Sequence, residues 1–164
     1  MGLIGERVEA LGPDDLVEVT LSLDTSAYAS GDVLAATQEV ASVFSGRRRA
    51  WLESLVVLDK DDQGQGLDVV FLRSNAALGT ENAAFAPSDA IAEEILGIVE
   101  VASGNFYDLT NSQIAIKSAA AGDAGMGVLL EPASGTSLYV GVVSRGTGTY
   151  TASGVVLKLG LRGA

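Results

Sequence analysis

The sequence predicts an all-β protein, a sandwich or barrel of short strands with one short helix. Apolar residues recur at every second position in many segments, which is the period of a strand with one buried face. Clusters of Gly, Ser, Asn and Thr separate these segments at short intervals. The 20 glycines among 164 residues supply the turns that such a fold requires.

The length fits one domain preceded by an N-terminal arm. A chain of 164 residues buries roughly 70% of its unfolded surface, so its core needs neither metals nor disulfides. We predict a domain over residues 17–164 and an arm over residues 1–16, which is polar and broken by Gly12 and Pro13. The largest side chains expected in the core are Phe44, Trp51, Phe71, Phe85 and Phe106.

The first half of the domain is predicted to contain five strands. The clearest alternation is in residues 17–23, where odd-numbered residues are apolar and even-numbered residues are polar. The other strands are expected at residues 33–35, 39–44, 51–58 and 67–72. Because the polar segment 60–66 separates the last two, which are nearly continuous apolar runs, we predict that they form a long hairpin.

One helix is predicted at residues 88–96. Ser88 can cap its N-terminus, Ile91 and Ile95 lie one turn apart, and Gly97 can end it. Further strands are expected after it at residues 98–102, 106–109, 113–116, 127–130, 138–143 and 155–161. The segment 118–127, rich in Ala and Gly, is expected to be a loop.

Composition disfavours several classes of function. The chain has no His and no Cys, which removes the side chains most used as general bases, metal ligands and nucleophiles, so we expect no catalysis, metal or cofactor. A net charge of -11 with ten basic residues disfavours nucleic acid. We see no secretory signal and no membrane-spanning segment, so we expect no membrane partner and synthesis in the cytoplasm.

The triple arginine Arg47, Arg48 and Arg49 is the one concentrated positive charge on this acidic chain. Guanidinium groups form forked hydrogen bonds with carboxylates, so these residues are our candidate protein interface. The alternative is a solvated hairpin tip without a partner, because single exposed charges contribute little to binding or stability.

The segment Asp59 to Gly64 is similar to the first half of a calcium-binding loop, with oxygen ligands at alternate positions before a glycine. The twelfth position of such a loop requires a bidentate Glu and is occupied by Val70. We therefore interpret the segment as a turn, with weak cation binding as the alternative. Gly146 to Gly148 is interpreted as a turn as well, because no phosphate-binding motif follows it.

Several segments, taken in order, resemble small structural proteins encoded in the genomes of tailed bacteriophages. The resemblance covers most of the chain after about residue 16. The segments are Asp24–Asp32, Leu55–Asp61, Leu67–Phe71, Ala84–Asp89, Ser137–Val140, Thr149–Thr151 and Val155–Leu161.

This resemblance implies a head decoration, or cementing, protein. The fold it implies is an antiparallel β-sandwich of the jelly-roll type, assembled as a homotrimer on the major capsid protein at the outer surface of the virion. The main alternative is a carbohydrate- or receptor-binding module of a phage tail or baseplate, in which exposed aromatic side chains stack on sugars. The candidates for stacking are Trp51, Tyr28, Tyr107, Tyr139 and Tyr150, of which Trp51 is expected in the core. A hydrolase that uses carboxylates is the third hypothesis.

Overall fold

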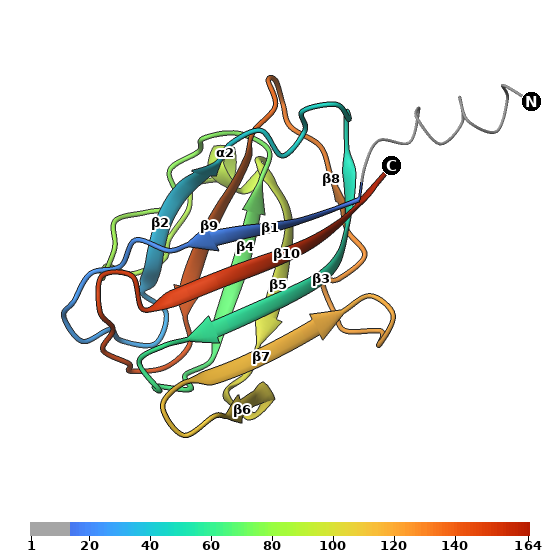
Figure 1. Ribbon diagram of the computed structural model, residues 1–164. Coiled ribbons are helices and arrows are strands. Elements are labelled where there is room, and N and C mark those ends of the chain that lie inside the picture. The colour runs from blue at the N-terminus through green and yellow to red at the C-terminus, as the bar shows by residue number, and fades with distance from the viewer. Residues whose placement is uncertain (1–13) are drawn as a thin grey trace, which may run out of the picture.

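The computed structural model describes residues 14–164, which form two antiparallel sheets packed face to face (Figure 1). The predicted arm lies outside the described residues except for residues 14–16. Of these, Asp15 and Leu16 already belong to β1. The first sheet contains, in spatial order, β1 (Asp15–Thr20), β10 (Val155–Gly163), β3 (Ala50–Asp59), β7 (Gln113–Ser118) and β6 (Phe106–Asp108), with β8 (Leu129–Leu130) beside the start of β3. The second sheet contains β2 (Val33–Val40), β9 (Leu138–Ser144), β4 (Leu67–Leu72) and β5 (Ile95–Val101).

The strand pairing is that of a jelly roll. Leaving out the short strands β6 and β8, the first strand in the chain pairs with the last, the second with the second-last, and so on inward: β1 with β10, β2 with β9, β3 with β7, and β4 with β5. A long hairpin rolled up into two sheets has this pairing. The predicted antiparallel, jelly-roll-like β-sandwich is therefore confirmed.

The predicted hairpin between residues 51–58 and 67–72 is wrong. These segments are β3 and β4, and they lie in different sheets, because the connection 60–66 crosses from the first sheet to the second. Side chains of this connection accept hydrogen bonds from the backbone of the β9–β10 loop, which holds the crossing in place. The three bonds are Thr151 N to Asp61 Oδ2 (2.8 Å), Thr149 N to Gln63 Oε1 (3.1 Å) and Thr147 N to Gln65 Oε1 (3.3 Å).

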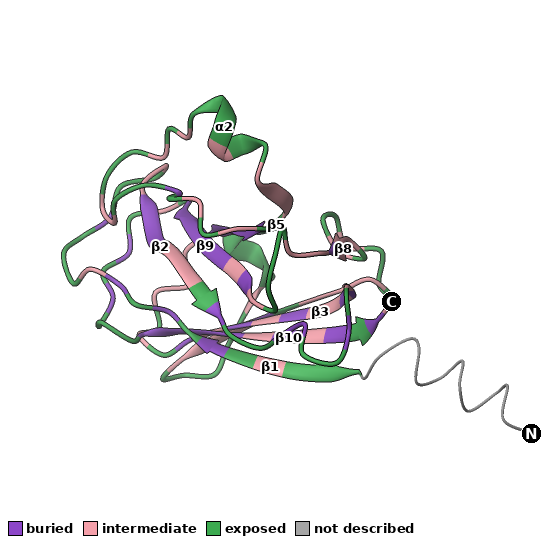
Figure 2. Ribbon diagram, turned by 90° about the horizontal axis from the view of Figure 1, so that it is seen from above, coloured by how far each residue is buried: buried purple, intermediate pink, exposed green. Residues whose placement is uncertain are grey.

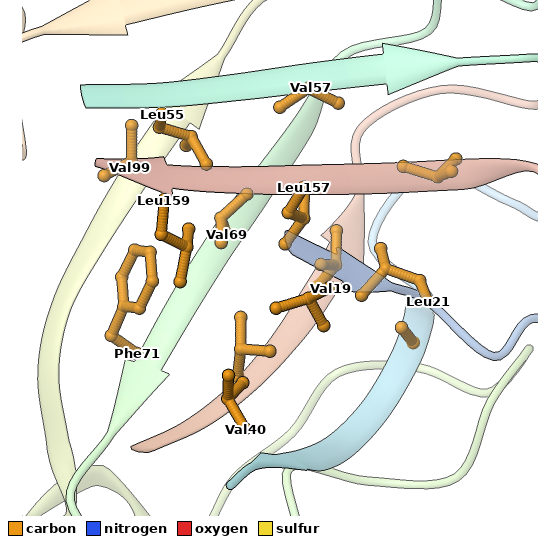
Figure 3. Packing of buried hydrophobic residues seen from close by; sticks show 14 of the residues in the cluster. Val19, Leu21, Val40, Leu55, Val57, Val69, Phe71, Val99, Leu157 and Leu159 are labelled. Atoms are coloured by element: carbon orange, nitrogen blue, oxygen red, sulfur yellow. The ribbon is translucent and has the colours of Figure 1, made fainter. Parts of the chain in front are cut away.

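The main core lies between the sheets, where alternate residues of facing strands meet. Figure 3 shows Leu55, Leu157 and Leu159 of the first sheet directed toward Val69 and Phe71 of the second, and all five are fully buried. Each such side chain stabilises the fold by about 1.5–3 kcal/mol relative to an exposed one.

The two outer faces differ. On the second sheet, Val70, Leu72 and Val143 point away from the main core and are buried under Leu78 of the β4–β5 connection, which forms a second apolar cluster. This double burial explains why β4 reads as a continuous apolar run. Within residues 14–164 the outer face of the first sheet has no such cover: Leu16 of β1 and Ile116 of β7 are exposed, and β1 is largely exposed along its length (Figure 2).

The predicted helix is present but shorter. Helix α2 spans Asp89–Ala92, and Ile95 already belongs to β5, where it pairs with Leu72. Pairing with a central strand satisfies the backbone of residues 95–97, so the helical pattern does not continue through them. Ser88 occupies the N-cap position, but its hydroxyl makes no capping hydrogen bond. The two strands predicted at 33–35 and 39–44 form the single strand β2, which ends at Val40.

Candidate functional site

Five of the seven arginines gather at one end of the sandwich, which we call the arginine end. This end contains the β2–β3 loop, the last residues of β10 and β4, and strand β8, and Figure 1 shows the described N-terminal strand beginning there too. Its arginines are Arg47, Arg48, Arg49, Arg73 and Arg162. A chain of net charge -11 therefore carries half of its basic side chains around two adjoining grooves.

The structure separates the three predicted interface residues. The side chain of Arg47 is only 1% exposed, its Nε donates to the carbonyl of Val43 at 2.7 Å, and its guanidinium lies 3.7 Å from Asp15. Arg47 therefore ties the β2–β3 loop to the start of β1 and is not a solvated side chain. Arg48 and Arg49 are the members of the triplet that reach solvent.

Two arginines of this end form ion pairs at the surface. Arg48, whose side chain is 81% exposed, donates from Nε to Glu131 at 3.2 Å. Arg162 donates to Glu53 from Nε and from a terminal nitrogen, both at 2.9 Å. Exposed pairs of this kind contribute about 0–1 kcal/mol, so they orient the guanidinium groups and can be exchanged for another carboxylate.

Two further arginines have no such pair. Within residues 14–164, neither the Arg49 side chain nor the exposed Arg73 side chain makes a hydrogen bond or an ion pair. An unpaired guanidinium keeps its five donors available, and a carboxylate from outside the chain can accept two of them at once. The strongest binding capacity of the arginine end therefore lies in these two side chains.

Trp51 lies on the outer face of the first sheet, beside these arginines, and not in the core as predicted. A β-bulge explains the difference. Ser54 pairs with Gly160 while Leu52 pairs with Leu161, so β3 contains one additional residue, Glu53, at this point. Without it, Trp51 would have the inward orientation of Leu55 and Val57. With it, Leu52 points inward and Trp51 outward.

The Trp51 groove, as we call it, has a volume of about 510 Å³. Trp51 is paired across the strands with Leu129 of β8 on one side and Arg162 of β10 on the other, and cross-strand partners share one face of a sheet. The result is an apolar floor with an arginine rim. The groove is lined by Arg48, Arg49, Trp51, Leu129, Arg162, Gly163 and Ala164.

The adjoining Arg73 groove has a volume of about 540 Å³ and shares Arg48 and Leu129 with the Trp51 groove. Its wall includes Arg73, Leu96 and the turn 131–135, which carries Glu131. The two grooves together form a basic trough in which Glu131 is the one acidic lining residue among the described residues.

The sequence motif at Asp59 to Gly64 is a turn, as interpreted. Asp59 is buried, and its carboxylate accepts three backbone N–H bonds, from Asp61 at 2.9 Å and from Gln63 and Gly64 at 2.8 Å each. These bonds occupy the oxygens that a cation would need. Among residues 14–164, no group of three or more acidic side chains is placed to hold a metal ion.

Two of the predicted sugar-stacking tyrosines are buried. Tyr28 and Tyr150 pack edge to face with ring centroids 6.1 Å apart. The Tyr28 hydroxyl donates to the carbonyl of Leu34 at 3.0 Å and accepts from the backbone N–H of Asp24 at 2.8 Å. Burial raises the pKa of Tyr28 to about 12 and that of Tyr150 well above its usual range. Tyr107, by contrast, is 70% exposed at the β6 edge.

No protein-family model matches the sequence, and no curated protein matches it. Solved structures with some similarity include one of Desmodium yellow mottle tymovirus, with 10% identity over 93% of this chain and 81% of that chain and a TM-score of 0.29. The native virion of Kashmir bee virus shows 13% identity over 93% and 71%, with a TM-score of 0.33. The full particle of Israeli acute paralysis virus shows 13% identity over 94% and 73%, with a TM-score of 0.30. Our assignment of the fold rests on the strand pairing and not on these similarities.

Among residues 14–164, no helix has the length and apolar composition needed to span a bilayer.

Proposed function

We propose that the protein is a head decoration protein of a tailed bacteriophage, which binds the major capsid protein on the outer surface of the assembled head and stabilises the shell. The observation that carries this proposal is a complete jelly roll that has a basic trough at one end and one sheet face that no other part of residues 14–164 covers. Jelly rolls of this kind are common in capsid and lectin domains and in cupins. A cupin metal site is not compatible with a chain that has no His.

Decoration gains its strength from repetition. A single contact through one end of a small domain buries a modest area, but symmetric copies that also contact one another add many such interfaces around each capsomer. We propose a homotrimer as the docked unit. The acidic remainder of the surface keeps free copies soluble and mutually repelling until they dock.

The experiment that tests this function is to add the purified protein to phage particles assembled without it. We expect saturable binding of many copies per particle, measured by gel densitometry, and a higher temperature at which the heads release their DNA. Binding of only a few copies, confined to the tail in electron micrographs, would contradict decoration.

A second candidate function is a carbohydrate- or receptor-binding module of a phage tail or baseplate. It is favoured by the partly buried Trp51 in its groove and by the strongly exposed Tyr107. A glycan array separates the two functions, since a specific hit that disappears in Trp51→Ala or Tyr107→Ala supports the module, whereas capsid binding with no hit supports decoration.

A further inference from the structure

We propose that the Trp51 groove binds an extended acidic segment of a partner protein, in which carboxylates contact the arginine rim and an apolar side chain rests on the floor. This inference deepens the proposed function and rests on it, because the partner on a phage head is the capsid shell. It adds Trp51, Leu129 and Arg162 to Arg48 and Arg49 of the predicted triplet and commits the surface to one kind of occupant.

The sign of the charge is the first argument. The whole chain has a net charge of -11, yet the described residues that line the groove include three arginines and no acidic side chain. Electrostatic complementarity at such a surface selects an anionic partner. Two whole copies of this chain, each with a net charge of -11, repel one another, so an acidic segment of a different protein is the better occupant.

The hydrogen-bonding chemistry is the second argument. Guanidinium groups and the indole N–H donate hydrogen bonds and accept none. A neutral sugar has hydroxyl groups that need acceptors as well as donors, and within residues 14–164 no Asp, Glu, Asn or Gln side chain lines the groove. Carboxylates accept only, so they match the rim.

The apolar floor distinguishes a peptide from other anions. Trp51 and Leu129 are adjacent cross-strand partners and together offer an apolar surface between the arginines. A peptide with alternating acidic and apolar residues places carboxylates at the rim and an apolar side chain on the floor.

The continuity of the two grooves indicates the length of the occupant. Because Arg48 and Leu129 line both grooves, a chain lying on Trp51 can continue past Arg48 to the unpaired Arg73. Arg48 would then exchange the carboxylate of Glu131 for one from the partner, which costs little at an exposed pair.

The test uses the full chain and its single tryptophan, whose emission reports directly on the groove. The probe is a labelled synthetic peptide in which glutamate and leucine alternate, and its counterpart carries glutamine in place of every glutamate. We expect a saturable change in Trp51 emission and in peptide anisotropy with the glutamate peptide only. Binding should weaken at high salt, because exposed charges are screened.

Matched charge reversals locate the site. We expect Arg49→Glu and Arg73→Glu each to weaken binding of the glutamate peptide by about tenfold or more, the cost of losing one charge-assisted contact. Lys158→Glu is the control, because it makes the same change in net charge on the outer face of the first sheet but outside both grooves. This variant should bind the glutamate peptide as the wild type does. Circular dichroism checks that each variant is folded.

Three outcomes overturn the inference: no saturable response up to about 1 mM peptide, equal binding of the glutamine peptide, or a polyuronate or single-stranded oligonucleotide that binds more tightly than the glutamate peptide. If Arg49→Glu and Arg73→Glu both decorate heads as the wild type does, the groove is not the docking site, but the proposed function still holds. Peptide binding without any capsid binding would overturn decoration and leave the groove intact.

Discussion

At the scale of single residues, Asp59 shows how one side chain can hold a connection between sheets. Its buried carboxylate accepts the backbone N–H groups of Asp61, Gln63 and Gly64 at the turn that leaves β3. Hydrogen bonds to a charged acceptor contribute about 1.5–3 kcal/mol, and a buried donor without a partner costs a similar amount. The sequence motif predicted the turn, but only the structure shows which carboxylate organises it.

Replacing this carboxylate should destabilise the whole domain. We expect Asp59→Asn to lower the free energy of unfolding by about 1.5–3 kcal/mol. The amide NH2 group replaces one carboxylate oxygen and cannot accept a hydrogen bond, so at least one backbone N–H group loses its partner. Asp62→Asn, an exposed substitution in the same turn at φ 55°, is the matched control and should change stability by less than about 0.5 kcal/mol. Urea denaturation measures both, and equal effects would contradict the role given to Asp59.

Tyr28 makes stability depend on alkaline pH. Its pKa is raised from 10.0 to about 12 by burial, so the folded state holds the proton more tightly than the unfolded state. The contribution of the protonated Tyr28 hydroxyl to the free energy of unfolding is therefore complete below pH 10 and is lost as the pH rises from 10 to about 12. We expect Tyr28→Phe to reduce the alkaline loss over this interval, measured as the urea midpoint against pH. An unchanged pH dependence in the variant would contradict this assignment.

At the scale of elements, the strands with strict alternation were predictable, and the positions that depend on a partner strand were not. The apolar run at residues 67–72 is β4 as predicted, and the strand predicted at 138–143 is β9 with one further residue. Trp51 was expected in the core because it lies in an apolar run, but the extra residue Glu53, which turns Trp51 outward, is recognisable only from the register of β3 against β10. The candidate site arises at that irregularity, so the arginine triplet could be found from the sequence but the groove beside it could not.

The loop between β7 and β8 also depends on a contact that the sequence does not reveal. Gly125 has φ 82°, and a Cβ atom there would lie 2.2 Å from the backbone oxygen of Ile98 in β5. Gly122 in the same loop has φ 75° and no atom near its Cβ position. A comparison of substitutions at Gly122 and Gly125 therefore separates two costs. Both include the cost of a left-handed conformation, and only the substitution at Gly125 adds the cost of a close approach between backbones.

We expect Gly122→Ala to destabilise the domain by about 1–2 kcal/mol, the penalty of a left-handed residue with a side chain. Gly125→Ala should cost about 3 kcal/mol or more, since a backbone clash is added to the same penalty. Thermal unfolding compares the two variants directly. Equal melting temperatures would show that the loop moves away from β5 without cost.

At the scale of the whole molecule, charge gives the sandwich two different ends. The arginine end gathers half of the basic side chains, whereas the opposite end carries the loops with Asp24, Asp32, Asp61 and Asp62. A docking partner that binds the arginine end would leave the acidic loops facing solvent, which also separates neighbouring particles by repulsion. The proposed function thus predicts one orientation on the head.

This orientation can be measured because the chain contains no cysteine, so a single introduced thiol is unique. Ser134 is exposed at the Arg73 groove and Ser153 is exposed at the opposite end, in the β9–β10 loop. We expect Ser153→Cys to react with a maleimide polymer equally fast on free and head-bound protein. Ser134→Cys should react at least tenfold more slowly when bound, because docking covers the trough. The reverse pattern would mean that the acidic loops contact the shell, and it would leave the arginine trough open to an occupant from outside the particle.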